Sequence, residues 1–184
     1  MRLSKLSYYA DFFISLAIIA VMASLAAVLP TWLKRGEWVL FVVAGALAWT
    51  FIEYLVHRWL YHHAPFFREM HDMHHNEPHA HIGAPPIIGI VLIFAIFYAP
   101  LLTVNAIAAS GVTVGILIGY VGYMVVHHAA HYWSMPQSSW LYQLRRHHAL
   151  HHHHAEDCNF GITTSLWDRV FGTAVQTSRA TAPT

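Results

Sequence analysis

Four clusters of histidine alternate with long apolar segments, and this pattern limits how the chain can fold. Seventeen of the 184 residues are histidine, and they fall within residues 57–63, 71–81, 127–131 and 147–154. An imidazole beside an apolar segment is costly to bury unless its ring nitrogens have partners. We therefore expect the four clusters to share one kind of partner, and a metal ion would satisfy them all.

Composition predicts an integral membrane protein. Hydrophobic residues make up 57% of the chain and charged residues only 10%, which is unlike a soluble domain. The net charge of +1 and the scattered basic residues give no nucleic-acid surface. The single cysteine, Cys158, excludes an internal disulfide and a cysteine-rich metal site. No small-x-small cleavage signature precedes Pro30, so we expect a retained anchor rather than a signal peptide.

Four apolar segments predict an all-α integral membrane protein with four transmembrane helices. The expected spans are residues 12–29, 38–59, 87–108 and 112–133, with a polar turn at 31–37 and a tight turn at 109–111. Residues 1–184 then form a single membrane domain. Its metal-binding regions, residues 57–81 and 127–173, form a histidine-rich helical cap.

The basic residues predict the orientation of these spans. Only Lys34 and Arg35 fall on the side opposite the termini. The positive-inside rule therefore places both termini and all four histidine clusters in the cytoplasm. The basic residues on that side are Arg2, Lys5, Arg58, Arg68, Arg145, Arg146, Arg169 and Arg179.

Spacing within the clusters predicts shared helix faces, because residues three or four apart lie on one side of a helix. The sets related in this way are His71 with His74 and His75, His127 with His131, and His148 with His151 and His152. His57 and His62 are five apart, so we expect the second span to end or distort between them. A site built of imidazole favours Fe, Zn, Cu or Ni over Mg or Ca.

Carboxylates near these histidines are expected to accept the second ring N–H of a ligand and so fix its tautomer. The candidates are Glu53, one turn before His57, and Asp72, beside His71, together with Glu77, Glu156 and Asp157.

The histidine pattern resembles that of a known family. The boxes His57-x4-His62, His71-x2-His74-His75, His127-x3-His131 and His148-x2-His151-His152 are similar to those of the fatty acid hydroxylase / sterol desaturase superfamily of membrane di-iron oxygenases. The closing segments 159–163 and 167–173 also resemble the stretch that follows the last box in fatty acid hydroxylases. The resemblance runs from about Glu53 to Thr173.

The resemblance implies ten histidine ligands around two iron ions that activate O2. The register of the last box is set by Phe160-Gly161, and His128 is an alternative to His127. The roles of His63, His79, His81, His147, His153 and His154 stay open. The implied ligands are His57, His62, His71, His74, His75, His127, His131, His148, His151 and His152.

The implied activity is hydroxylation of a fatty acyl chain or acyl lipid taken from the bilayer. No haem, flavin or nicotinamide motif is visible, so we expect a separate electron donor, either a cytochrome b5-like protein or a ferredoxin with its reductase. Zinc could enter the site by mis-metallation. Two alternatives stay open: a carotenoid or sterol-type hydroxylase or desaturase, and a non-catalytic zinc-binding membrane protein. A metal carrier is disfavoured, because its ligands would lie near the bilayer midplane.

Two further expectations concern residues near the boxes. Asp168 and Arg169 are expected to hold the C-terminal segment through a structural ion pair. Aromatic side chains could line a lipid tunnel or form an interfacial belt. These are Trp59, Tyr61, Phe66, Phe67, Tyr132, Trp133 and Trp140.

Overall fold

A computed structural model describes residues 1–154 and 156–175 of the chain, and in these residues the fold is helical. The α-helices are α1 (Lys5–Ala27), α2 (Trp32–Leu55), α3 (Pro65–Asn76), α4 (Pro86–Ile93), α5 (Ala99–Leu102), α6 (Ala106–Tyr132), α7 (Trp140–His153) and α8 (Leu166–Val170). Two π-helices, η1 (Val56–Tyr61) and η2 (Phe94–Tyr98), continue α2 and α4. Arg179 lies outside the described residues.

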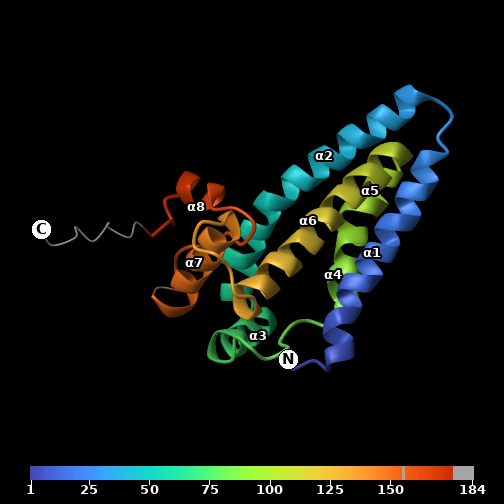
Figure 1. The fold of residues 1–184 in the computed structure, drawn as a ribbon. Coiled ribbons are helices and arrows are strands. Elements are labelled where there is room, and N and C mark those ends of the chain that lie inside the picture. The colour runs from blue at the N-terminus through green and yellow to red at the C-terminus, as the bar shows by residue number, and fades with distance from the viewer. Residues whose placement is uncertain (155, 176–184) are drawn as a thin grey trace, which may run out of the picture.

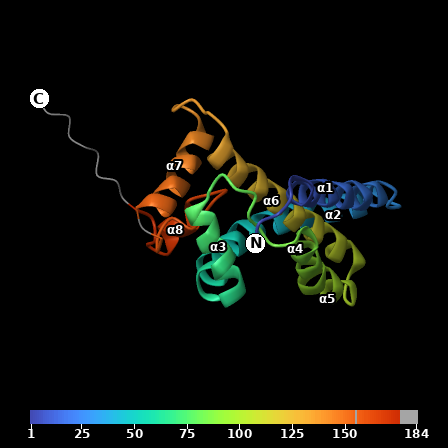
Figure 2. The ribbon, with the colours of Figure 1, turned by 90° about the horizontal axis from the view of Figure 1, so that it is seen from below.

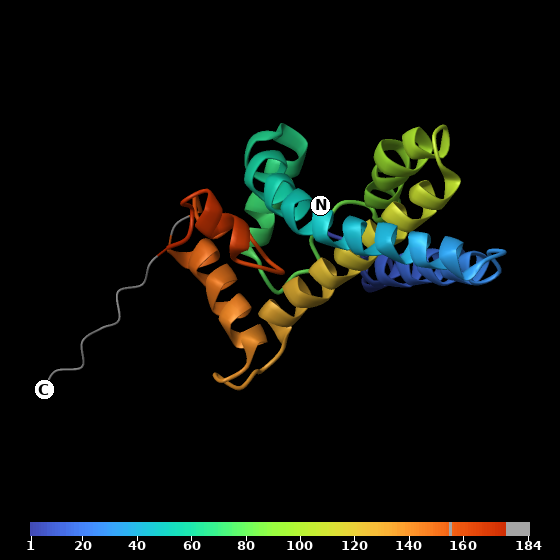
Figure 3. The same cartoon turned by 90° about the horizontal axis from the view of Figure 1, so that it is seen from above.

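Three helical segments are long and apolar enough to cross a membrane: Lys5–Ala27, Trp32–Tyr61 and Ala106–Tyr132. The apolar helix Ile87–Leu102 is shorter than the roughly 20 residues that usually span a bilayer. Figure 1 shows α1, α2, α6 and the α4–α5 rod side by side, with α3, α7 and α8 gathered at one end. The same separation is visible from below (Figure 2) and from above (Figure 3).

Two predicted turns are placed differently in the structure. The turn expected at residues 109–111 is helical, and the chain reverses before α6 instead. The Asn105 side chain caps this helix by accepting hydrogen bonds from the backbone N–H groups of Ile107 and Ala108, at 2.9 and 3.0 Å. Likewise, Thr31 caps α2, so most of the predicted polar turn at 31–37 lies within the first two turns of that helix.

Glycine allows α2 and α6 to approach each other closely. A Cβ atom added to Gly115 would lie 2.1 Å from the carbonyl oxygen of Val42, and one added to Gly45 would lie 2.3 Å from that of Val112. Small residues at helix contacts are common inside membranes, where packing replaces the hydrophobic driving force. The pair α2–α6 is therefore the rigid support from which the histidine-rich end extends.

Replacing Gly115 with alanine is expected to destabilise the protein by about 1–3 kcal/mol, because the added methyl group forces the two backbones apart. The measurement is the denaturation temperature in detergent. Gly122→Ala is the matched control on the same helix, since a Cβ there meets no atom within 4 Å. Equal denaturation temperatures for the two variants would contradict the close-packing role of Gly115.

Candidate metal centre

The end of the second span is distorted where the spacing of its histidines predicts a distortion. Residues Val56–Tyr61 form the π-helix η1, in which hydrogen bonds join residues five apart rather than four. His57 and His62 are therefore brought onto the same side of the chain. Their rings lie 5.6 Å apart at an interplanar angle of 28°.

Helices α3, α6 and α7 bring the other histidine clusters to the same place. Helix α3 begins with Pro65, whose missing N–H is not needed in the first turn. Helix α7 begins after Ser139, whose hydroxyl accepts a hydrogen bond from the Tyr142 N–H. The C-terminal ends of α3, α6 and α7, which carry these histidines, meet beside η1 (Figure 1). Histidines that are far apart in the sequence therefore become neighbours.

Four histidines form a first group: His57, His62, His71 and His151 offer nitrogens that all lie within 4.8 Å of one another. The Nε2 atom of His57 lies 3.1 Å from Nε2 of His71 and 3.0 Å from Nε2 of His151. The Nε2 atom of His75 approaches that of His71 to 3.0 Å.

Five histidines form a second group. The distance between Nε2 of His131 and Nε2 of His148 is 3.0 Å. His75 lies between the two groups, because its ring also stacks on His152 at 4.1 Å. The structure therefore gathers all ten predicted histidines at one site. The members of the second group are His74, His127, His131, His148 and His152.

Backbone carbonyl groups fix the ring orientation of two of these histidines. Nδ1 of His57 donates to the carbonyl oxygen of Phe160 at 2.5 Å, and Nδ1 of His151 donates to that of Cys158 at 2.7 Å. A carbonyl oxygen only accepts, so the proton sits on Nδ1 and the Nε2 lone pair faces the group. Lone pairs that face each other at about 3 Å repel unless a cation or a proton lies between them.

Burial keeps these imidazoles neutral, which is the form that binds metal. The pKa of His74 is lowered to about 3, that of His62 to about 4 and that of His151 to about 3, in each case mainly by desolvation. Neighbouring histidines lower the pKa of each further.

The donor set fits transition-metal ions. Two nitrogens each about 2.1 Å from one ion and at right angles to each other lie about 3.0 Å apart, which matches the Nε2 separations in both groups. Several buried ring nitrogens also have no hydrogen-bond partner among the described residues. They are Nε2 of His62 and His74, Nδ1 of His75 and His148, and both ring nitrogens of His152.

The two histidines that left the register of a box open make contacts away from both groups. His128 points elsewhere: its Nδ1 lies 3.2 Å from the Tyr8 hydroxyl and its ring stacks on Tyr132. His147 turns its Nε2 to the Asp168 carboxylate at 2.9 Å. The remaining histidines, His63, His79, His81, His153 and His154, also lie outside both groups.

The Glu53 carboxylate is buried. It does not accept the hydrogen bond from the His57 ring that the sequence predicted. One oxygen accepts the backbone N–H groups of Ile162 and Thr163 at 2.7 and 2.8 Å, and the other accepts the Thr163 hydroxyl at 2.7 Å. The ring N–H of His57 is already bonded to a carbonyl oxygen. Glu53 therefore holds the loop that contains the Phe160 carbonyl group. It does not contact His57 through a hydrogen bond.

The other predicted carboxylates lie at the surface, and one of the four approaches a histidine of the site. Solvent exposure lets them form ion pairs that need no ring N–H partner. Asp72 pairs with Arg68, Glu77 pairs with Arg2, Glu156 lies 3.7 Å from Nδ1 of His75, and Asp157 is exposed.

Asp168 is a buried anchor whose partners differ from those predicted. Its carboxylate accepts the backbone N–H groups of Phe160 and Gly161, both at 2.8 Å, and the Thr173 hydroxyl at 2.7 Å. Its ion-pair partner is His147 rather than Arg169. These hydrogen bonds outweigh desolvation and lower the pKa of the carboxyl group. The segment that orients His57 and His151 is thus held from both sides, by Glu53 and Asp168.

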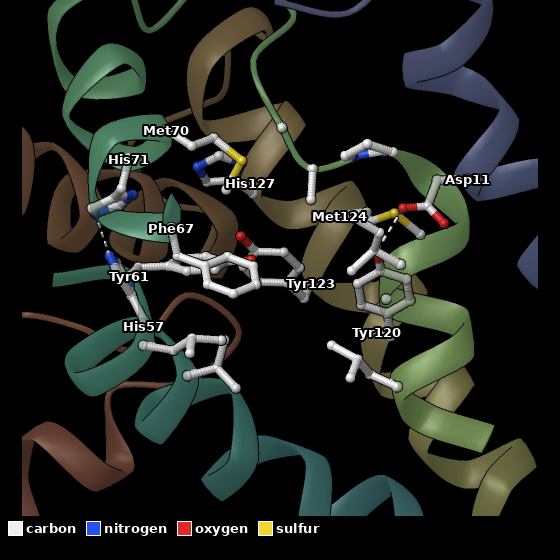
Figure 4. A pocket seen from close by; sticks show the side chains of 18 of the residues that line it. Asp11, His57, Tyr61, Phe67, Met70, His71, Tyr120, Tyr123, Met124 and His127 are labelled. Carbon is white, nitrogen blue, oxygen red and sulfur yellow. Dashed lines mark hydrogen bonds between the residues drawn. The ribbon is translucent and has the colours of Figure 1, made fainter. Parts of the chain in front are cut away.

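An apolar cavity of about 290 Å³ reaches the histidines from between the membrane helices. Figure 4 shows His57, His71 and His127 at one end of the view and Asp11 with Tyr120 at the other. Tyr61 and Phe67, two of the predicted tunnel aromatics, line the cavity. The other five are exposed at the surface, from 38% for Tyr132 to 64% for Trp140; they also include Trp59, Phe66 and Trp133.

The cavity has lining residues that the spacing of the boxes did not reveal. Tyr123 of α6 stacks on His127 with ring centroids 5.6 Å apart, and Tyr120 lies one turn deeper in the same helix. Asp11 reaches the cavity from α1. A carboxylate in an apolar N-terminal span was the available signal, because such residues usually serve a function.

Sequence comparison agrees with this geometry. The profile of the fatty acid hydroxylase family matches residues 42–173. The chain belongs to the fatty acid hydroxylase family. It is 36% identical over 145 residues to a fatty acid 2-hydroxylase of Rattus norvegicus, covering 72% of this chain and 39% of that protein. It is 33% identical over 145 residues to a dihydroceramide fatty acyl 2-hydroxylase of Arabidopsis thaliana, covering 73% of this chain and 60% of that protein.

A solved structure of this family shares the fold. The hydroxylase domain seen in full-length scs7p aligns with a TM-score of 0.79 at 24% identity, covering 92% of this chain and 67% of that one. The histidine-rich end and its supporting helices thus belong to a known architecture. The chain spans only part of the length of the curated relatives it matches.

Proposed function

We propose that this membrane protein hydroxylates an acyl lipid with O2, using electrons from a separate donor protein. The observation that carries the proposal is the apolar cavity whose wall includes His57, His71 and His127. A cavity of this kind can bring an aliphatic chain to the histidine groups while keeping water out. Membership in the fatty acid hydroxylase family supports the same reaction class.

The proposed cofactor is a pair of iron ions held by the ten histidines. His57, His62, His71 and His151 would hold one ion, the second group of five would hold the other, and His75 would lie between them. When bound, the iron pair supplies the O2 activation needed to oxidise an unactivated C–H bond. Zinc fits the same nitrogen donors, so a non-catalytic zinc protein is the alternative.

The protein's own contribution is to orient the ligands and the substrate. The carbonyl groups of Cys158 and Phe160 hold two ligand protons on Nδ1 and so keep the Nε2 atoms free. Tyr123, Tyr61 and Phe67 line the cavity beside the histidines. An acyl chain confined in this way meets the metal centre at one carbon position, and water is excluded from its path.

We propose that both chain termini and the metal centre face the cytoplasm; residues 176–184 at the C-terminus lie outside the described part of the chain. Helices α2 and α6 end at the histidine groups, and α1 begins on that side (Figure 1). The basic residues Arg58, Arg68 and Arg145 belong to that end, whereas Lys34 and Arg35 belong to the opposite one, as the positive-inside rule requires. In this orientation the α4–α5 rod is a short fourth crossing.

The test is the metal content of protein purified from iron-supplied cells, combined with lipid profiles of cells with and without the protein. We expect about two iron ions per chain and a new hydroxylated acyl lipid. A desaturated lipid would show that the reaction is desaturation rather than hydroxylation. A hydroxylated carotenoid or sterol would show that the substrate is not an acyl lipid. Bound zinc, with no oxidised product after iron reconstitution and addition of reductant, would favour the zinc-binding alternative.

A further inference from the structure

Asp11 is an ionisable side chain on an apolar helix that is long enough to cross the membrane. It lies in the second turn of α1, and its carboxyl group lines the lipid cavity. A carboxyl group is costly at such a position, so it usually has a polar partner or a function. The histidine groups do not use it, because Figure 4 shows it across the cavity from His57 and His71.

Only one oxygen of this carboxyl group is paired. The Tyr120 hydroxyl donates to Oδ2 at 2.5 Å. The second oxygen, Oδ1, is buried and has no hydrogen-bond partner among the described residues. A buried acceptor without a donor costs free energy, and the group that lowers this cost is a hydrogen-bond donor.

The wall of the cavity that Asp11 lines is mainly apolar. Phe12 comes from α1, Ile88 and Leu92 from α4, and Met124 from α6. None of these side chains can donate a hydrogen bond. Ser7, Tyr8, Tyr61 and Tyr123 also line the cavity, but among the described residues no hydroxyl group donates to Oδ1. A donor carried by the molecule that occupies the cavity would satisfy this oxygen.

We propose that Oδ1 of Asp11 accepts a hydrogen bond from a hydroxyl or amide N–H group of the bound lipid. The Tyr120 hydroxyl fixes the carboxyl rotamer, so the pair acts as a positioning and specificity site across the cavity from the metal centre. A lipid that carries such a donor is held at one position along the cavity. A simple acyl ester has no hydrogen-bond donor and cannot bind Asp11 in this way. This inference rests on the proposed function, because it takes the cavity to be the lipid site.

The same pair also joins α1 to α6, so a purely structural role has to be separated from recognition. Tyr120→Phe removes the link between the helices but leaves a carboxyl oxygen in the cavity. Asp11→Leu removes both. A helix tether predicts the same behaviour for the two variants, whereas lipid recognition predicts different behaviour.

The test is lipid binding to the protein as purified in detergent, with its bound metal and without reductant, followed as the rise in denaturation temperature. Three probes are compared: an N-acyl sphingoid base, its N-methylated amide, and its O-methylated form. Wild type is expected to bind one of the two methylated probes about tenfold more weakly than the parent, which identifies the donor as the amide N–H or a hydroxyl group. We expect this discrimination to disappear in Asp11→Leu and to persist, at a reduced level, in Tyr120→Phe, whose carboxyl group is no longer held in one rotamer.

The proposal is overturned if wild type binds the three probes equally, or if both variants weaken all three probes to the same extent. Should Asp11→Leu fail to fold, Asp11→Asn is the second variant. Its amide retains the size of the side chain but can present N–H groups to the cavity, so the discrimination is again expected to be lost. Binding needs no turnover, so a failure of the hydroxylase assignment would appear separately, as a lack of oxidised product in the iron-loaded enzyme.

Discussion

Replacing His127 with alanine is expected to remove metal from the second histidine group and to lower lipid hydroxylation by at least about a hundredfold. His127 belongs to a group of five nitrogens within 4.8 Å of one another, and its ring lies against His74, His131 and His148. Loss of a group that merely orients a ligand typically costs ten- to a hundredfold in metal affinity or activity, and loss of the ligand should cost more. The measurements are metal content per chain and the yield of hydroxylated lipid.

His128→Ala is the matched control, because it removes the adjacent imidazole from the same helix. His128 contacts Tyr8 and Tyr132 and lies outside both histidine groups. Metal content is therefore expected to stay at the wild-type level in this variant. Loss of metal from His128→Ala with retention in His127→Ala would reverse the register of the third histidine box.

The grouping of the ten histidines could be predicted because side chains that share a helix face leave a spacing in the sequence. His71 and His75 are one helical turn apart, and the five-residue interval from His57 to His62 indicated a distortion that the π-helix η1 confirms. The groups that orient these rings could not be predicted in the same way. They include the backbone carbonyls of Cys158 and Phe160, and a backbone carbonyl has no residue identity for a motif to reveal.

The helix boundaries were missed for a different physical reason. Residues 109–111 are small, and small residues are common both in turns and at close helix contacts. Hydropathy does not separate these cases, because the apolar segment continues through them. The helix-capping side chain of Asn105 was the better local signal, since an Asn before an apolar run can satisfy the first free N–H groups of a helix.

The sequence predicted a lipid tunnel near the histidine boxes but only some of the residues that line the cavity. Aromatic residues near the boxes were the candidates, and burial selected Tyr61 and Phe67 among them. Tyr123 was not a candidate, because it lies in the middle of an apolar span and four residues before His127. Its place in the wall follows from how α6 packs against α1, α2 and α4, which pattern alone does not give.

Asp168→Ala is expected to lower the free energy of unfolding by about 3 kcal/mol, because a buried carboxylate that accepts several hydrogen bonds is lost. The N–H groups of Phe160 and Gly161 would remain buried without their acceptor. The carbonyl of Phe160 orients His57, so metal affinity is expected to fall about ten- to a hundredfold as well. The measurements are the denaturation temperature in detergent and a metal titration of the metal-free protein.

Asp157→Ala is the matched control, since it removes an exposed carboxylate from the same loop. Its denaturation temperature and metal affinity are expected to match those of wild type, because surface charges contribute little to stability. If Asp168→Ala yields no folded protein, Asp168→Asn retains one acceptor oxygen and should give a smaller loss in the same direction. Unchanged metal affinity in a destabilised Asp168 variant would show that the loop supports the fold without orienting the ligands. A loss of both would mean that one buried carboxylate links the stability of the C-terminal segment to the geometry of the metal centre.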